Sequence, residues 1–299
     1  MDTVRTTVGG VGLDVVVAGP PDGPPVLLLH GFPEFWYGWH RQIEPLARAG
    51  CRVLVPNQRG YDTSDKPPGV AAYGLDVLAA DAVGLSSLAG DRPLHVVGHD
   101  WGGLVAWWTA LRHPDRVATL TVLNAPHPIA FAGYLRRHPS QRRRSRYIGW
   151  FQVPWAPEFL LGRNGCALLK KTLVRSSRRG TFGDADVARY VAAWQQPGAL
   201  TAMLNWYRGL RRARPAPPAD PRIRVPTRVL WGARDAFLEV GLAEASVGLC
   251  NGPASHRVFP EATHWLQHEQ PDEVVQEILA QVRGTAPGTS PTAPGTARG

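Results

Sequence analysis

The sequence predicts an α/β protein with a mostly parallel central sheet and a helical lid inserted after the sixth strand. Short, continuously apolar segments, which are typical of buried parallel strands, alternate with segments of helical periodicity through most of the chain. The alternation stops at about residue 128 and resumes after residue 221. We therefore expect a core domain made of residues 1–127 and 222–283, with residues 128–221 forming a helical cap.

Length and composition are those of a globular protein. The chain has 299 residues, of which 44% are hydrophobic and 19% are charged, so it is long enough to bury a full core. No apolar run approaches the roughly 20 residues that span a bilayer, and the N-terminus lacks a secretory signal. We expect a cytoplasmic protein with no membrane partner. The three cysteines, Cys51, Cys166 and Cys250, lack metal-ligand spacing and are expected to be reduced thiols.

The net charge of +9 raises the question of an anionic partner. Basic clusters occur at Arg142–Arg144, Arg178–Arg179 and Arg211–Arg212. No nucleic-acid-binding motif accompanies them. We expect a solvated basic face and no nucleic-acid partner, with an anionic partner as the alternative.

The N-terminal elements lead to a candidate binding loop. Two β-like segments, Val4–Val8 and Leu13–Val17, are separated by glycines and predict an antiparallel hairpin. The apolar segment Val26–Leu29 predicts an inner parallel strand. It ends in the loop that contains Gly31, Phe32 and Pro33, at the carboxyl end of a central strand, where open α/β sheets bind ligands. Gly31 permits a close approach of the backbone, and the N–H of Phe32 is free to point into the site.

The middle of the chain continues the alternation up to the cap. The periodicity and apolar runs predict a helix over 39–49, a strand over 53–55, a helix over 73–88, a strand over 94–97, a helix from residue 104 and a strand over 117–123. Such alternation implies right-handed crossovers between parallel strands.

Asp100 occupies a sharp turn between a strand and a helix. Gly98 precedes it by two positions, and Gly102 and Gly103 follow. Small residues at these positions let the strand and the helix meet without Cβ clashes. This is the layout of a nucleophile elbow in which aspartate stands in place of the usual serine.

The C-terminal part supplies two partners for Asp100. A strand over 227–231 leads to Asp235, a helix is expected over 242–249, and a short strand over 256–259 leads to His264. Nucleophile, acid and histidine in this order are typical of an α/β-hydrolase triad. A last helix is predicted over 271–283, and the Gly-, Thr-, Ala- and Pro-rich residues 284–299 are predicted to be disordered.

An aspartate nucleophile restricts the chemistry. A carboxylate, ionised at neutral pH, displaces a leaving group at an sp³ carbon and forms an ester of the enzyme. Hydrolysis of that ester needs a base near neutral pH, which His264 supplies while Asp235 orients its ring. The oxyanion then develops on the Asp100 carboxyl, and the backbone N–H groups of Phe32 and Trp101 are the natural donors.

The leaving group distinguishes two kinds of enzyme. A halide leaves as a stable anion and needs only N–H donors such as tryptophan indoles. An epoxide leaves as an alkoxide and needs an acid, for which a tyrosine hydroxyl is suited. The cap offers Tyr147 and Tyr207, each within an aromatic cluster.

The chain resembles the epoxide hydrolases of the α/β-hydrolase superfamily over nearly all of residues 4–283. The matching segments are His30-Gly31-Phe32-Pro33-Glu34, Gly98-His99-Asp100-Trp101-Gly102-Gly103, Asn205-Trp206-Tyr207-Arg208, Trp231-Gly232-Ala233-Arg234-Asp235 and Thr263-His264-Trp265. The resemblance implies an α/β-hydrolase fold, Asp100 as the nucleophile and Asp235 and His264 as the water-activating pair. It also implies that Tyr147 and Tyr207 polarise the epoxide.

Related dehalogenases match the chain less well. Haloalkane dehalogenases share the Asp-Trp elbow, but typically have asparagine where this chain has Phe32. Fluoroacetate-type dehalogenases typically have arginine after the nucleophile, where Trp101 stands here. Asn124 lies where some relatives place the triad acid, and because an amide cannot take that role, Asp235 is left as the acid.

We therefore expect hydrolysis of a small apolar epoxide by water, without a metal or organic cofactor, by a monomer or homodimer. The side chains expected to line the substrate pocket are those of His30, Pro33, Phe35, Trp36, Trp150 and Trp265. The alternatives are a haloalkane or haloacid dehalogenase that uses the same triad, and a non-catalytic small-molecule receptor on this fold.

Overall fold

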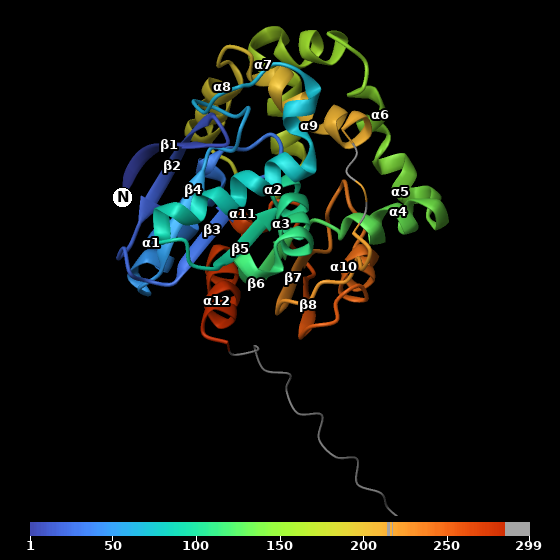
Figure 1. Cartoon of the computed structure of the whole chain (residues 1–299). Coiled ribbons are helices and arrows are strands. Elements are labelled where there is room, and N and C mark those ends of the chain that lie inside the picture. Colours follow the sequence, from blue (N-terminus) through green and yellow to red (C-terminus); the bar gives the residue numbers. More distant parts are fainter. Residues whose placement is uncertain (214–215, 217, 285–299) are drawn as a thin grey trace, which may run out of the picture.

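A single eight-stranded sheet forms the centre of the protein (Figure 1). The computed structural model describes residues 1–213, 216 and 218–284. The strands lie in the order β1-β2-β4-β3-β5-β6-β7-β8. Their bounds are β1 Asp2–Val8, β2 Val11–Ala18, β3 Pro25–Leu29, β4 Arg52–Pro56, β5 Leu94–His99, β6 Val117–Leu123, β7 Thr227–Gly232 and β8 Ala254–Phe259. The sheet confirms the predicted fold class.

The pairing of the strands follows the predicted pattern. β1 and β2 form an antiparallel hairpin, and β2 also pairs antiparallel with β4. From β4 to β8 every neighbouring pair is parallel. The carboxyl ends of β3, β5, β6, β7 and β8 therefore meet at one edge of the sheet, where the loops that follow them lie together.

Helices connect the strands and cover both faces of the sheet. The α-helices are α1 His40–Arg48, α2 Leu75–Gly84, α3 Trp101–Arg112, α4 Pro128–Arg137, α5 Pro139–Arg144, α6 Arg146–Trp150, α7 Ala156–Ser176, α8 Asp184–Trp194, α9 Ala199–Arg212, α10 Gly241–Val247, α11 Leu266–Glu269 and α12 Pro271–Val282. Short 3₁₀ helices are η1 Trp36–Trp39, η2 Val70–Tyr73, η3 Leu85–Ala89 and η4 Pro114–Arg116.

The inner strands are apolar throughout because both of their faces are covered. Along β3, Val26 and Leu28 belong to the cluster that packs against α1 and α12. Leu27 and Leu29 face the other way and join the cluster that includes α2, α3 and α10. All four side chains are buried. For this reason β3 consists of consecutive apolar residues and does not alternate between apolar and polar ones.

Helices α4 to α9 lie between β6 and β7 in the chain and form the region in which the sequence predicts the cap. In Figure 1 they lie along the top and one side of the core. α7 is interrupted at residues 163–166, where Asn164, Gly165 and Cys166 have positive φ angles. It therefore consists of two helical segments. No helix in the described part of the chain combines the length and the hydropathy needed to cross a membrane. The predicted disordered tail lies, from residue 285 onward, outside the described residues.

We predict that a buried ion pair is important for the stability of the core. Glu277 on α12 receives hydrogen bonds from Arg228 Nε and Nη2 at 2.7 and 3.1 Å, and from Arg257 Nη1 at 2.9 Å. Glu277→Ala leaves the buried Arg228 charge without its partner, so we expect the free energy of unfolding to fall by about 3 kcal/mol, measured by urea denaturation. Glu44→Ala, which breaks an exposed pair with Arg48, is the control and should cost less than about 1 kcal/mol. Equal losses in the two variants would contradict the prediction.

Candidate active site

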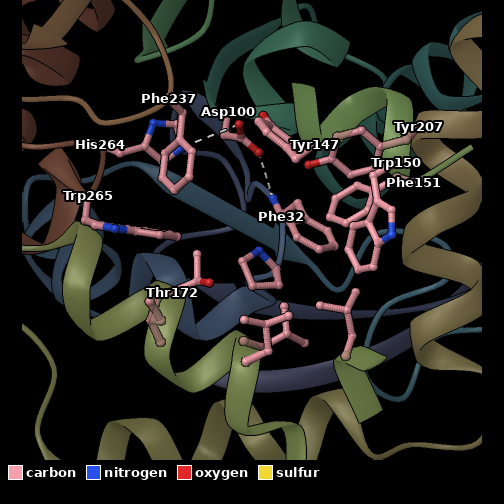
Figure 2. A pocket seen from close by; sticks show the side chains of 15 residues that line it. Phe32, Asp100, Tyr147, Trp150, Phe151, Thr172, Tyr207, Phe237, His264 and Trp265 are labelled. Atoms are coloured by element: carbon pink, nitrogen blue, oxygen red, sulfur yellow. Dashed lines mark hydrogen bonds and ion pairs between the residues drawn. The ribbon is translucent and has the colours of Figure 1, made fainter. Parts of the chain in front are cut away.

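Asp100 lies at a tight turn between β5 and α3. Its φ and ψ angles are 50° and −117°, a conformation that residues with a Cβ seldom adopt. The turn depends on its glycines, because a Cβ at Gly102 would lie 2.2 Å from the Leu29 carbonyl oxygen. A Cβ at Gly98 would lie 2.3 Å from the Gly102 carbonyl oxygen. This close packing of α3 on β3 and β5 holds the Asp100 carboxylate at the base of a cavity (Figure 2).

The three residues predicted as a triad lie together. His264 Nδ1 is 2.7 Å from Asp235 Oδ2, and His264 Nε2 is 3.4 Å from Asp100 Oδ2. Asp235 and His264 are buried, whereas the Asp100 side chain retains 16% exposure. The imidazole therefore lies between a fully enclosed carboxylate and one that faces the cavity.

Asp235 is held by a full set of hydrogen-bond donors. Its Oδ1 accepts the backbone N–H groups of Phe237 and Leu238 at 2.7 and 3.0 Å. Its Oδ2 accepts Asn124 Nδ2–H at 2.7 Å in addition to the His264 ring. Asn124 thus lies beside the acid as a supporting amide. Such donors hold a buried carboxylate in one orientation.

The charges of the two carboxylates determine the protonation of His264. Burial lowers the pKa of His264, but the adjacent Asp235 and Asp100 outweigh burial and raise this pKa to about 10. Burial raises the pKa of Asp100, yet the hydrogen bond and charge of His264 hold it below the usual value. In the free protein, the site therefore contains an imidazolium between two carboxylates.

One of the two predicted oxyanion donors contacts the nucleophile. Phe32 N–H donates to Asp100 Oδ1 at 2.9 Å, which leaves Oδ2 toward His264 and the cavity. The peptide bond between Phe32 and Pro33 is cis. Trp101 is the first residue of α3, a position whose N–H has no partner inside the helix.

The two predicted tyrosines lie on helices between β6 and β7, in the same cavity as Asp100. Tyr147 on α6 and Tyr207 on α9 line the same cavity as Asp100, with ring centroids 6.0 Å apart (Figure 2). The Tyr207 ring also packs edge-on against Phe32 and Trp101, at 5.2 and 4.8 Å. Burial and the nearby Asp100 carboxylate raise the pKa of both hydroxyls, so both stay protonated.

An apolar cavity of about 280 Å³ lies in front of Asp100 and His264. Its walls come from the core and from cap helices α6, α7 and α9. The lining residues are Phe32, Pro33, Asp100, Tyr147, Trp150, Phe151, Leu161, Leu168, Leu169, Thr172, Leu173, Tyr207, Phe237, His264 and Trp265. Among the lining side chains only Asp100 and His264 carry charge, which favours a neutral ligand.

A second, smaller space of about 90 Å³ lies on the other side of the tyrosine pair. It shares Asp100, Tyr147 and Tyr207 with the first cavity. Its remaining lining residues are Trp101, Leu104, Ala125, Pro126, Pro128, Phe131, Ile148, Leu210 and Leu238. The reacting groups thus have unequal apolar spaces on two sides.

Three of the predicted pocket residues line the cavity, namely Pro33, Trp150 and Trp265, and three do not. Phe35 and Trp36 follow the cavity-lining part of the loop, and the Phe35 ring packs in the core against Tyr190, with centroids 5.5 Å apart. The backbone N–H of Trp36 donates to Asn57 Oδ1.

The prediction that His30 lines the pocket was wrong, because its ring is buried under the loop residues that line the cavity and does not reach the cavity itself. His30 Nε2 accepts Gln58 N–H at 3.1 Å, and the ring packs edge-on against Tyr61. Burial lowers the pKa of His30 to about 4, so it is neutral and able to accept this bond.

A buried polar cluster beside the triad was not predicted. The Glu34 carboxylate is bonded to Tyr190 Oη–H at 2.8 Å, His268 Nε2 at 2.7 Å, Gln267 Nε2–H at 2.8 Å and His99 Nδ1 at 3.1 Å. Burial raises the pKa of Glu34, but the two histidines outweigh burial and lower it. The opposite nitrogen of His99 donates to the His264 carbonyl at 2.8 Å. The cluster therefore ties the triad histidine to the loop that carries Phe32. Glu34 and His99 belong to the matching motif segments of the sequence, and from this position the cluster could have been predicted.

Helix α5 also contacts the loop that contains Asp235. On α5, Gln141 Nε2–H donates to the Phe237 carbonyl at 2.8 Å, and Gln141 Oε1 accepts Glu239 N–H at 2.8 Å. Just after it along the helix, Arg144 Nη1 donates to the Asp235 carbonyl at 2.7 Å. The Arg-rich segment around α5 thus has a structural role at the loop of Asp235 that composition alone did not indicate.

Comparisons with known proteins identify chains and structures that are similar to this one. Residues 24–271 match the model of the family described as alpha/beta hydrolase fold. The AB hydrolase superfamily protein YfhM of Bacillus subtilis is 45% identical over 95% of this chain and 99% of its own length. Human Epoxide hydrolase 4 is 38% identical over 92% of this chain and 76% of its own length. A crystal structure of Bacillus megaterium epoxide hydrolase with an inhibitor is similar with a TM-score of 0.85 at 29% identity, covering 94% of this chain and all of that one.

We predict that the charge of Asp100 sustains the high pKa of His264. Asp100→Asn removes one of the two carboxylates, so the pKa of His264 should fall below its value of about 10 in the unmodified protein. Titration of the ring by NMR measures it, with Asp22→Asn in a surface loop as the control. Because the pKa in the unfolded chain is about 6.5, these ion pairs stabilise the fold fully below pH 6.5, and that stabilisation is lost as the pH rises through about 10. An unchanged titration in Asp100→Asn would contradict the prediction.

Proposed function

This chain belongs to the epoxide hydrolases of the α/β-hydrolase superfamily, and from that premise we propose that it converts an epoxide to a vicinal diol through an ester formed on Asp100. One observation carries the proposal: the Asp100 carboxylate shares an apolar cavity with the half-buried Tyr147 and the buried Tyr207, with His264 beside it. A carboxylate nucleophile and a pair of acids are what opening of an epoxide ring requires.

In the first step Asp100 Oδ2 attacks a ring carbon. A C–O bond forms to the carboxyl, the ring C–O bond breaks, and its electron pair passes to the ring oxygen, which takes a proton from Tyr147 or Tyr207. An alkoxide is nearly as basic as hydroxide, whose parent water has a pKa of about 15.7, so it accepts this proton even from a tyrosine of raised pKa. The Asp100 charge that raises the pKa of both tyrosines disappears as the ester forms.

In the second step water cleaves the ester. Loss of the Asp100 charge removes one of the two causes that raise the pKa of His264, so the ring gives up its proton and can act as the base. That proton passes through solvent to the tyrosinate and restores its hydroxyl. His264 then takes a proton from the water that attacks the carboxyl carbon of Asp100. The N–H groups of Phe32 and Trp101 stabilise the oxyanion. Its collapse breaks the ester C–O bond and releases the diol oxygen, which takes the proton from His264. The regenerated Asp100 carboxyl then returns its remaining proton to the ring.

The cavities support a neutral, apolar epoxide as the substrate. The lining side chains include no charged group besides the reacting Asp100 and His264, so a carboxylate or phosphate on the substrate would have no partner. Spaces of about 280 and 90 Å³ on the two sides of the tyrosines suit substituents of unequal size on the oxirane ring.

We predict that His264→Gln traps the ester. Without a base, the first step proceeds and the second stalls, so intact-protein mass spectrometry should find Asp100 carrying the whole mass of the epoxide. A haloalkane would instead add its mass minus that of the hydrogen halide, which distinguishes the dehalogenase alternative. Asp100→Asn should show no adduct. Continued turnover of epoxide by His264→Gln with no adduct would refute the two-step scheme.

We predict that the tyrosines are needed for ring opening. Tyr207→Phe and Tyr147→Phe should each lower kcat/KM for an epoxide, and the double variant should lower it by roughly 10²- to 10⁴-fold, because positioned acids contribute about this much. The control is Tyr134→Phe on α4, since Tyr134 lines neither cavity. Wild-type kcat/KM in the double variant would rule out the tyrosines as the acids.

A further inference from the structure

The outer surface of α7 and of the turn before it exposes large apolar side chains. Trp155 is 77% exposed and Phe159 is 63% exposed. The other exposed apolar residues of this segment are Val153, Leu160, Leu168 and Val174. We call the exposed part of residues 153–179 the α7 face; Figure 1 shows α7 at the top of the molecule, on the side away from α12. Exposed aromatic and aliphatic side chains gathered in one segment mark an interaction surface.

The same segment is strongly basic. Its cationic residues are Arg163, Lys170, Lys171, Arg175, Arg178 and Arg179. In the described part of the chain none of the six takes part in a salt bridge. The segment has one acidic residue, Glu158, and its carboxylate is paired with Arg208 at 2.7 Å. The charge of the α7 face is therefore available to an anionic partner.

The large cavity opens through this face. Leu168 and Thr172, one helical turn apart on α7, both line the cavity of about 280 Å³ and are both exposed to solvent. Leu169 and Leu173, which also line it, are buried beneath them. A ligand that enters between these side chains arrives from the surface that carries the exposed aromatic and basic residues.

We propose that the α7 face docks on the surface of a bilayer that contains anionic lipids. Tryptophan and phenylalanine side chains insert at the boundary between headgroups and acyl chains, and lysine and arginine bind the anionic headgroups. Docking in this way needs no membrane-spanning helix. It brings the cavity mouth to the bilayer, in which apolar molecules concentrate. This revises the expectation, drawn from composition, of no membrane partner.

Other partners fit the α7 face less well. A second copy of the chain docked through the same face would set two groups of six cations, none of them in a salt bridge within the described residues, against each other. A nucleic acid would pair with the cations, but phosphates and sugars offer nothing to the exposed Val153, Leu160 and Val174. A bilayer uses both the charge and the apolar side chains.

Flotation with lipid vesicles tests the proposal. The full-length protein is mixed with vesicles of phosphatidylcholine alone, or of phosphatidylcholine with phosphatidylglycerol, at low and high salt. We expect it to float with the anionic vesicles, to stay unbound with the neutral ones, and to bind less as salt screens the charges. Both Lys171→Glu/Arg175→Glu and Trp155→Ser/Phe159→Ser should reduce binding at least about 10-fold. The control, Arg48→Glu/Arg234→Glu, makes the same charge change on exposed core side chains and should bind as the wild type does.

Thermal unfolding of every variant verifies its folding independently of any enzymatic activity. None of the substituted side chains lines either cavity. The proposal is wrong if the wild type does not float with anionic vesicles, or if the α7-face variants bind as well as the control. Retention on immobilised DNA without vesicle binding, or a dimer that the α7-face substitutions dissociate, would assign the face to those partners instead.

Discussion

An imidazolium held between two carboxylates in an otherwise apolar site is the interaction on which the functional centre depends. Taking three charges out of water is costly unless each is paired and hydrogen-bonded. The structure meets that condition on the enclosed side, where Asp235 receives two backbone N–H groups and an amide besides the ring. On the cavity side Asp100 receives only Phe32 N–H and the more distant His264. The asymmetry leaves Asp100 as the less firmly held of the two carboxylates and the one that faces the cavity.

The packing that exposes Asp100 also builds its surroundings. Because Gly102 lets α3 approach the end of β3, the loop after β3 reaches the nucleophile and presents Phe32 N–H to it. Glu34, two residues further along this loop, reaches through His99 to the backbone of His264. A single close contact between a helix and a strand therefore aligns the nucleophile, its backbone donor and its histidine. A side chain at Gly102 would displace all three at once.

The sequence predicts the core and the proximity of Asp100, Asp235 and His264 well, and the pocket walls less well. Segments such as Val26–Leu29 are recognisable because strands covered on both faces must be apolar at every position. Asp100, Asp235 and His264 are recognisable because the topology brings strand-end loops together. Phe35 and Trp36 were misplaced, since membership of a loop does not say which side chains turn toward the site. The α7 residues of the wall, such as Thr172, were missed because the docking of a cap helix is decided by tertiary contacts that leave no local pattern.

The hydrogen bonds between α5 and residues 235–239 restrict how this part of the molecule can move. Gln141 and Arg144 of α5 form three hydrogen bonds with the backbone of residues 235, 237 and 239. Movement of α5 away from the core would break these hydrogen bonds. It would shift the loop that contains Asp235, which contacts His264. Helix α5 is therefore bound to the loop of Asp235, whereas α7, which lines the cavity, makes a separate wall and is divided at residues 163–166. The helices between β6 and β7 thereby support the Asp235–His264 pair at one place and enclose the cavity at another.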